Sequence, residues 1–184
     1  FIGCEVAAGL SARGLAVSLV EPAPTPLAVA LGERIGALVS RLHVANGIDL
    51  RTGVGVAKID VSDGRVSAVE LTDGTTLPAD IVVYGIGVIP NDSWLSASGL
   101  LVDNGVVLNE YCQAVDAVNV YAVGDVARWR HQKHGEDVRI EHWTNAVEQA
   151  ACVAYNIIHP DQPRAYTPIE YVWSDQHDWK IQVV

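Results

Sequence analysis

The first 21 residues, FIGCEVAAGLSARGLAVSLVE, constrain the fold of this chain most. Apolar side chains recur every three or four residues from Ile2 to Ala12, which is the spacing of one helix face, and Gly14 follows as a stop signal. The run from Ala16 to Val20 is typical of a buried strand, and it ends in one acidic residue, Glu21. A helix, a glycine turn and an apolar strand closed by an acid form the second half of a dinucleotide-binding βαβ unit.

Within this unit, Gly3 is predicted to be the last glycine of a G-x-G-x-x-G fingerprint whose earlier part would precede Phe1. Glu21 lies close to the distance of about 20 residues at which an acid accepts hydrogen bonds from the adenosine ribose. No arginine follows before Arg34, so a ribose 2′-phosphate would meet no nearby cation, and NAD is predicted rather than NADP. Ordinary α/β packing without a nucleotide is the alternative.

The composition indicates a globular protein, because 49% of the 184 residues are hydrophobic and 18% are charged. No apolar run reaches the ~18 residues of a membrane helix and no secretory signal is visible, so a cytoplasmic protein without membrane association is predicted. A net charge of −10 argues against nucleic acid as a partner. Cys4, Cys112 and Cys152 form no C-x-x-C pair, so neither a disulfide framework nor a metal site is expected.

Helical and strand-like patterns alternate along the rest of the chain. A helix is predicted from about Gly32 to Ala45 and another from roughly Thr144 to Ile158. Between residues 48 and 77 the alternation is that of strands, with turn signals that predict a small antiparallel excursion. The aromatic stretch YVWSDQHDWKIQVV, residues 171–184, is also strand-like.

Two short apolar runs that end in glycine, ADIVVYGIG and VNVYAVGD, are predicted to be buried parallel strands whose carboxyl ends face a ligand. Gly85 and Gly87 would let the backbone approach a flat or charged ligand, and a tight turn is the alternative. Gly124 and Asp125 close the second run. The Asp125 carboxylate either caps a following helix or accepts hydrogen bonds from the hydroxyls of a sugar-like chain, near a helix N-terminus that faces a pyrophosphate.

Four stretches resemble the FAD- and NAD-dependent pyridine nucleotide-disulfide reductase superfamily, and within it the bacterial ferredoxin reductases that serve oxygenases and cytochromes P450. They are VVYGIGVIPN, VYAVGD, RIEHWTNAVEQA and YVWSDQ. The resemblance implies an α/β, Rossmann-like flavoprotein fold with two dinucleotide-binding domains, truncated at both ends, and the start of an α+β C-terminal domain. The implied domains are NAD-binding (1–78), the second half of an FAD-binding domain (79–141) and the start of the C-terminal domain (142–184).

The resemblance also implies roles for individual residues on the NAD side. Gly3 matches the last fingerprint glycine, and Glu5 matches a catalytic glutamate near the flavin and the nicotinamide. Glu21 matches the ribose acid, whereas Gly85 and Gly87 match positions beside the nicotinamide path.

On the FAD side, the resemblance implies that Asp125 holds the ribityl chain above Gly124. Trp143 and Thr144 would cover the isoalloxazine, where Trp143 would act in catalysis by shielding the reduced flavin from water and oxygen. Trp173 is included in the implied flavin site. The alternative for Trp143 is a core tryptophan at a domain junction.

The implied activity is electron transfer from NADH through FAD to a small [2Fe-2S] ferredoxin. Two alternatives stay open: an NADH oxidase or coenzyme A disulfide reductase, which needs a redox cysteine near the flavin, or a non-catalytic module like apoptosis-inducing factor. The chain is expected to be an internal portion of such a reductase and inactive alone. A sheet edge left unpaired by a missing first strand would also permit homodimers.

Overall fold

The computed structural model describes residues 1–184, and these form two compact units. Unit 1 comprises Phe1–Ile86 with Ser174–Ile181, and unit 2 comprises Gly87–Trp173 with Gln182–Val184. The predicted boundaries at residues 78 and 141 concern cofactor binding and stay predictions. None of the helices has both the length and the apolar character that a membrane crossing requires.

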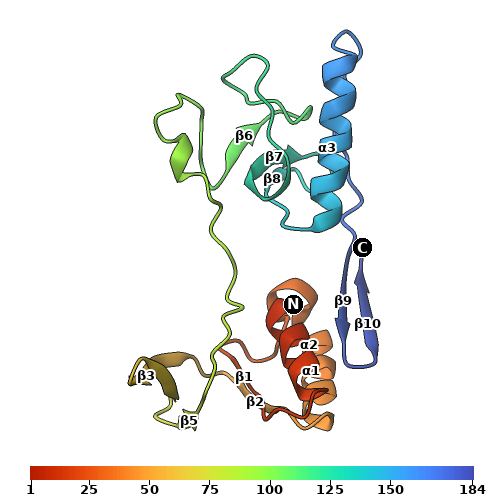
Figure 1. Ribbon diagram of the computed structural model, residues 1–184. Coiled ribbons are helices and arrows are strands. Elements are labelled where there is room, and N and C mark those ends of the chain that lie inside the picture. Colours follow the sequence, from red (N-terminus) through yellow and green to blue (C-terminus); the bar gives the residue numbers. More distant parts are fainter. The chain divides into compact units, whose positions relative to one another are not determined.

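Unit 1 begins with helices and strands that alternate (Figure 1): α1 (Ile2–Ser11), β1 (Ser18–Glu21), α2 (Ala28–Ala45) and β2 (Asp49–Thr52). The two strands are parallel, with Glu21 opposite Thr52. Helix α1 buries small side chains, Cys4, Ala7 and Ala8, which allow close packing. In α2 the backbone leaves helical geometry at Gly32, so the regular helix follows that residue as predicted. The predicted βαβ-type order is therefore confirmed.

Three antiparallel strands continue unit 1 in the order β3-β4-β5: β3 (Val56–Ser62), β4 (Arg65–Leu71) and β5 (Thr76–Pro78). The turn between β3 and β4 has positive φ at Asp63 (53°) and Gly64 (76°), as in a type I′ turn. The antiparallel excursion is thus where the sequence predicts it.

Unit 2 contains two 3₁₀ turns, three strands and one long helix: η1 (Ser93–Leu95), β6 (Val106–Leu108), η2 (Gly124–Val126), β7 (Ala127–His131), β8 (Glu136–Val138) and α3 (Trp143–Ile158). Strand β7 pairs in parallel with β6 and antiparallel with β8. The hydrophobic core of unit 2 surrounds Trp129, which is 1% exposed and packs against Tyr166. Helix α3 confirms the predicted helix.

The last element is a two-stranded sheet of β9 (Val172–Gln176) and β10 (Trp179–Val183), which confirms the strand-like pattern at the end of the sequence (Figure 1). His177 in the connecting turn has a positive φ of 55°.

The two predicted buried strands at residues 79–87 and 118–125 are wrong. The first has no strand partner, and most of its side chains are exposed, with Ile86 at 87%. The second has a positive φ at Asn119 and only one isolated bridge, between Gln113 and Tyr121. An apolar run becomes a strand only when neighbouring strands pair with its N–H and C=O groups, and no strand of this chain does so here.

Candidate functional site

The candidate NAD site of unit 1 lies where β1 ends. Glu21 is half-buried at the carboxyl end of this parallel strand, the edge at which open α/β sheets bind ligands. Its Oε1 accepts a hydrogen bond of 2.9 Å from the Ala23 N–H, which fixes the carboxylate, and no hydrogen bond occupies Oε2. That oxygen is an available acceptor for a ribose hydroxyl, so Glu21 fits the predicted role.

Gly85 and Gly3 lie side by side in unit 1. A Cβ atom on Gly85 would stand 3.0 Å from the Gly3 nitrogen and 3.1 Å from its Cα, so the two backbones can approach this closely only with glycine at position 85. The structure thus brings together two predicted nucleotide-site glycines at the start of α1. Gly87, in unit 2, is exposed with a φ of 91° and open space around it.

Glu5 is connected to a buried chain of polar side chains in unit 1. The Ser174 hydroxyl is 2.6 Å from Glu5 Oε1, and Gln176 Nε2 is 2.9 Å from Ser174 Oγ. The chain continues from Gln176 Oε1 to His43 Nε2 at 3.1 Å, and from His43 Nδ1 to His177 Nε2 at 3.1 Å. Ser174, Gln176 and His43 are fully buried.

With Glu5 ionised, the donor and the acceptor of each hydrogen bond in this series of side chains are determined. The carboxylate only accepts, so the Ser174 O–H donates to it and accepts in turn from the Gln176 amide N–H. The Gln176 oxygen then accepts from His43 Nε2–H, which leaves His43 Nδ1 to accept from His177 Nε2–H. The network therefore orients Glu5 through side chains from α2 and β9.

Burial lowers the pKa of His43 below its usual range, and the positive charge that His177 can carry lowers it further. A neutral His43 is also what the hydrogen-bond directions require, because its Nδ1 must accept. Sequence reasoning missed Ser174, Gln176, His43 and His177. The signal available was the SDQH run after Trp173, but nothing in the sequence places it against α1 and α2.

The predicted FAD residues of unit 2 gather at the first turn of α3. Gly124 has a φ of 72°, a Cβ there would stand 3.3 Å from the Ala146 Cβ, and its N–H donates to buried Gln149 Oε1 at 2.8 Å. These constraints favour glycine and hold η2 against α3, whose first turn carries Trp143 and Thr144.

Asp125 does not cap a helix. It lies inside η2, whose N-cap is Val123, and its exposed carboxylate makes no hydrogen bond, although its backbone oxygen accepts from Arg139 at 3.0 Å. Trp143 is 73% exposed. An available carboxylate, an exposed indole and an α3 N-terminus without a side-chain cap fit the hydroxyls, ring and phosphates of FAD.

Thr144 and Trp173 are joined through Tyr171. The Thr144 hydroxyl donates to the Tyr171 backbone oxygen at 2.8 Å, and the Tyr171 and Trp173 rings stack with centroids 5.9 Å apart. Of the predicted flavin residues, Gly124, Asp125, Trp143 and Thr144 therefore share one location, and Trp173 adjoins it.

The three cysteines are poorly suited to redox chemistry. Burial raises the pKa of Cys4 and Cys152, and it raises that of Cys112 to about 12. A redox cysteine reacts as the thiolate, which a raised pKa disfavours at neutral pH. All three thiols are free.

Comparison with known proteins identifies the relatives. Rhodocoxin reductase of Rhodococcus erythropolis is 38% identical over 183 residues, which cover 100% of this chain and 42% of that protein. The ferredoxin–NAD(+) reductase component of the anthranilate 1,2-dioxygenase system of Burkholderia cepacia is 38% identical over 184 residues, covering 100% of this chain and 44% of that protein. The chain thus spans less than half the length of these relatives.

A solved structure shares the same fold. The covalent putidaredoxin reductase–putidaredoxin complex matches with a TM-score of 0.90 and 41% identity, covering 98% of this chain and 43% of the matched chain. This match confirms the predicted Rossmann-like flavoprotein fold class. A model of the pyridine nucleotide-disulphide oxidoreductase family matches residues 1–150. The resemblance read from the sequence is therefore confirmed, and the chain belongs to the pyridine nucleotide-disulphide oxidoreductase family, with similarity to its ferredoxin reductases.

Proposed function

We propose that this chain is part of a flavoprotein reductase that passes electrons from NADH through FAD to a small [2Fe-2S] ferredoxin. The observation that carries the proposal is the match of the whole chain, at 38% identity, to a protein named as a ferredoxin–NAD(+) reductase component. The available Glu21 carboxylate supports NAD, and the grouping of Asp125 with Trp143 supports FAD. A homodimer and a cytoplasmic location stay predictions.

Each unit has a separate task in this proposal. Gly3, Gly85 and Glu21 bind and orient NAD, and Glu5 acts near the nicotinamide in the geometry that Ser174 imposes. Gly87 adjoins the nicotinamide path. FAD supplies the chemistry, since a flavin accepts a hydride and releases single electrons.

In unit 2, Asp125 accepts hydrogen bonds from flavin hydroxyls beside Gly124. Trp143, Thr144 and Trp173 shield the ring from water.

The reductase activity is tested with the full-length protein that contains this chain, supplied with FAD, NADH and a [2Fe-2S] ferredoxin. We expect NADH-dependent bleaching of the ferredoxin spectrum under nitrogen. NADH consumption that needs only oxygen would indicate an oxidase, and nucleotide binding without turnover would indicate a non-catalytic module. The buried, high-pKa cysteines disfavour a disulfide reductase that uses a cysteine of this chain.

Glu21→Ala is expected to weaken NADH binding by about 10- to 150-fold, because a hydrogen bond to a charged group contributes about 1.5–3 kcal/mol. Glu21→Arg should move the preference toward NADPH, since a cation then faces the 2′-phosphate. The measurement is KM for both nucleotides, with exposed Glu110→Ala in unit 2 as the matched control. Unchanged nucleotide preference in both Glu21 variants contradicts the assignment.

Ser174→Ala is expected to slow flavin reduction by NADH about tenfold, because Glu5 loses the donor that orients its carboxylate. Ser174 is a positioning residue, so KM for NADH should change less than the rate of reduction. Stopped-flow measurement of flavin absorbance checks this, with Glu5→Gln as a direct comparison and exposed Ser62→Ala as a control. A Ser174→Ala protein that reduces flavin at the wild-type rate would show that the network does not position Glu5.

A further inference from the structure

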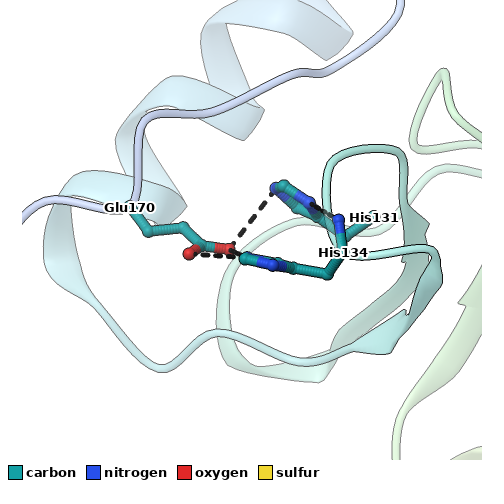
Figure 2. A group of neighbouring side chains, drawn as sticks. All are labelled: His131, His134 and Glu170. Carbon is teal, nitrogen blue, oxygen red and sulfur yellow. Dashed lines mark hydrogen bonds and ion pairs between the residues drawn. The ribbon is translucent and has the colours of Figure 1, made fainter. Parts of the chain in front are cut away.

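Two histidines and a glutamate converge at one place in unit 2 (Figure 2). His131 ends β7, and His134 lies in the turn between β7 and β8. Glu170 comes from the segment before β9. One ligand atom from each side chain lies within 4.8 Å of the others, so the three point toward a common centre.

The distances suit a metal ion shared by all three side chains. His134 Nε2 lies 2.8 Å and 2.9 Å from the two Glu170 oxygens, and His131 Nε2 lies 3.4 Å from Oε1. Ligand atoms at about 2.0–2.2 Å from a tetrahedral zinc ion stand roughly 3.4 Å apart. The His131–Glu170 separation already matches this spacing, and His134 needs to withdraw by only about half an ångström.

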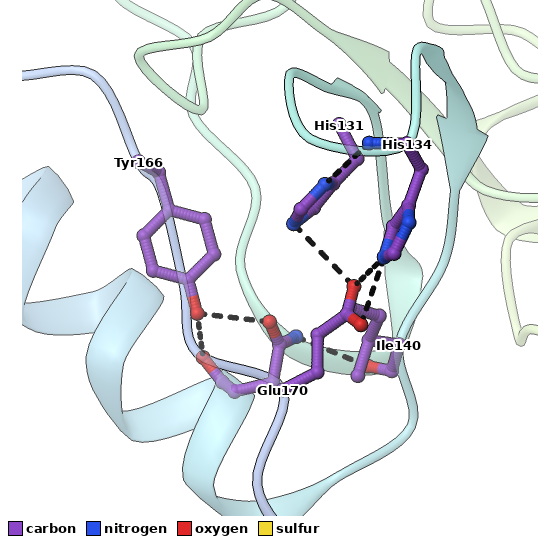
Figure 3. Close-up of polar contacts among 6 residues, drawn as sticks. His131, His134, Ile140, Tyr166 and Glu170 are labelled. Carbon is purple, nitrogen blue, oxygen red and sulfur yellow. Dashed lines mark hydrogen bonds and ion pairs between the residues drawn. The ribbon is translucent and has the colours of Figure 1, made fainter. Parts of the chain in front are cut away.

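His131 provides an independent reason to expect a ligand. Its side chain is 3% exposed, and its buried Nε2 faces Glu170 without making a hydrogen bond. Buried polar atoms in proteins are nearly always paired, so an unpaired one needs an explanation. Figure 3 shows this nitrogen and His134 pointing toward Glu170, while the Nδ1 side of the His131 ring faces the His134 backbone.

The surroundings are compatible with a cation. An open cavity of about 550 Å³ beside the cluster is lined by His134, Glu170 and two further acids, Glu136 and Glu141. Arg139 also lines it, but its charge is paired with Glu141 at 2.6 Å. Lys133 is the opposing charge close to His131.

We propose that His131, His134 and Glu170 form a site for a divalent transition-metal ion, Zn²⁺ in the first place. Two imidazoles and one carboxylate are a ligand set that zinc uses in proteins, with water in the fourth position. Ca²⁺ and Mg²⁺ prefer all-oxygen sites, so the imidazoles select against them. Binding through His131 Nε2 places its ring proton on Nδ1 and gives up only the long 3.4 Å contact from the His134 N–H.

The ion would tie the β7–β8 turn to the segment that leads into β9. This role is separate from the proposed reductase activity and does not depend on it. The spacing H-x-x-H in RHQKH is the sequence signal for the site, but its third ligand lies 36 residues beyond His134 and cannot be identified from the sequence.

The test is zinc binding to the purified protein without a histidine tag, after chelator treatment and dialysis. Isothermal titration with ZnCl₂ should show one equivalent bound with a micromolar or lower Kd, and Co²⁺ should give the visible absorption of a four-coordinate site. His134→Ala and Glu170→Gln are the main variants. These side chains are 36% and 27% exposed, so replacing them disturbs the packing less than replacing the buried His131 would. Each variant should weaken zinc binding at least tenfold, since the loss of even an outer-shell partner typically lowers metal affinity by about 10–100-fold.

His159→Ala is the matched control, because His159 is an exposed histidine of the same unit that lies outside the cluster. Circular dichroism shows whether each variant is folded, and a zinc-induced rise in Tm that Glu170→Gln abolishes is a second readout. Wild-type protein that binds zinc only at millimolar concentration overturns the proposal. Equal losses in His159→Ala and Glu170→Gln overturn it too, because binding would then be nonspecific.

Discussion

Gly36→Ala is expected to lower the free energy of unfolding of unit 1 by about 3 kcal/mol, the upper part of the range for overpacked sites. Gly36 lies in α2 against the loop that follows Glu21. A Cβ there would stand 2.1 Å from Thr25 Oγ1, 2.5 Å from the Pro26 backbone oxygen and 2.8 Å from Thr25 Cβ. Pro26 is buried and its oxygen belongs to the main chain, so the loop has to shift as a whole.

Gly9→Ala is the matched control for this substitution. Gly9 lies in the interior of α1, and its Cβ would meet only Arg13 NH1, at an ordinary 3.6 Å. This change should stabilise the protein by about 0.5–1 kcal/mol, because alanine favours a helix over glycine. Hydrogen exchange of peptides from α1 and α2 measures both effects within unit 1. Two glycine variants of equal stability would contradict the packing argument.

A double variant tests which contact is responsible. Thr25 Oγ1 is buried and makes no hydrogen bond, so Thr25→Ala alone should cost little in hydrogen bonding. In combination with Gly36→Ala it removes the closest clash but leaves the one with Pro26, so part of the lost stability should return. The single Gly36 variant should also weaken NADH binding, because the shifted loop begins directly after Glu21.

The parts of the fold that could be predicted are those with a local cause. The helix face from Ile2 to Ala12 and the Asp63-Gly64 turn depend on neighbours a few residues away, and both occur as expected. The run at residues 79–87 has the composition of a buried strand, but pairing needs a second strand, which composition does not report.

The site divides in the same way. The place of Glu21 at the end of β1 could be predicted, because the strand pattern ends at this residue, whereas its role in NAD binding stays a proposal. The partner of Glu5 could not, because Ser174 lies 169 residues away and meets it only after β9 packs in unit 1. The part that His43 plays in the network could not be predicted for the same reason. An α2 histidine with apolar neighbours gives no sign that it contacts a glutamine 133 residues later.

His43→Leu is expected to destabilise unit 1 by about 2–4 kcal/mol at pH 8, because it leaves the fully buried Gln176 oxygen without a donor and His177 without an acceptor. Leucine fills a similar space, so the lost hydrogen bonds dominate the effect. His159→Leu, at an exposed position, should stay within about 0.5 kcal/mol of wild type.

The size of the His43 effect should fall at acidic pH. Burial lowers the folded-state pKa of His43, so the unfolded chain, with a histidine pKa of about 6.5, binds the proton more readily than the folded one. Wild-type unit 1 therefore keeps this contribution above about pH 6.5 and loses it as the pH falls toward the lowered folded-state value. A leucine cannot titrate, so His43→Leu lacks this loss, and the gap between the two proteins should narrow from pH 8 to pH 5.

Urea unfolding of both proteins at pH 8, 6.5 and 5, monitored by hydrogen exchange in α1 and α2, measures the difference in their free energies of unfolding directly. Burial also lowers the pKa of His131 and His142 in unit 2, but both proteins contain them, so their contribution cancels in the difference. A gap that is constant across this pH range would mean that His43 is protonated as easily in the folded protein as in the unfolded chain. The assignment of His43 Nδ1 as a neutral acceptor, which connects His177 to the Glu5 network, would then be wrong.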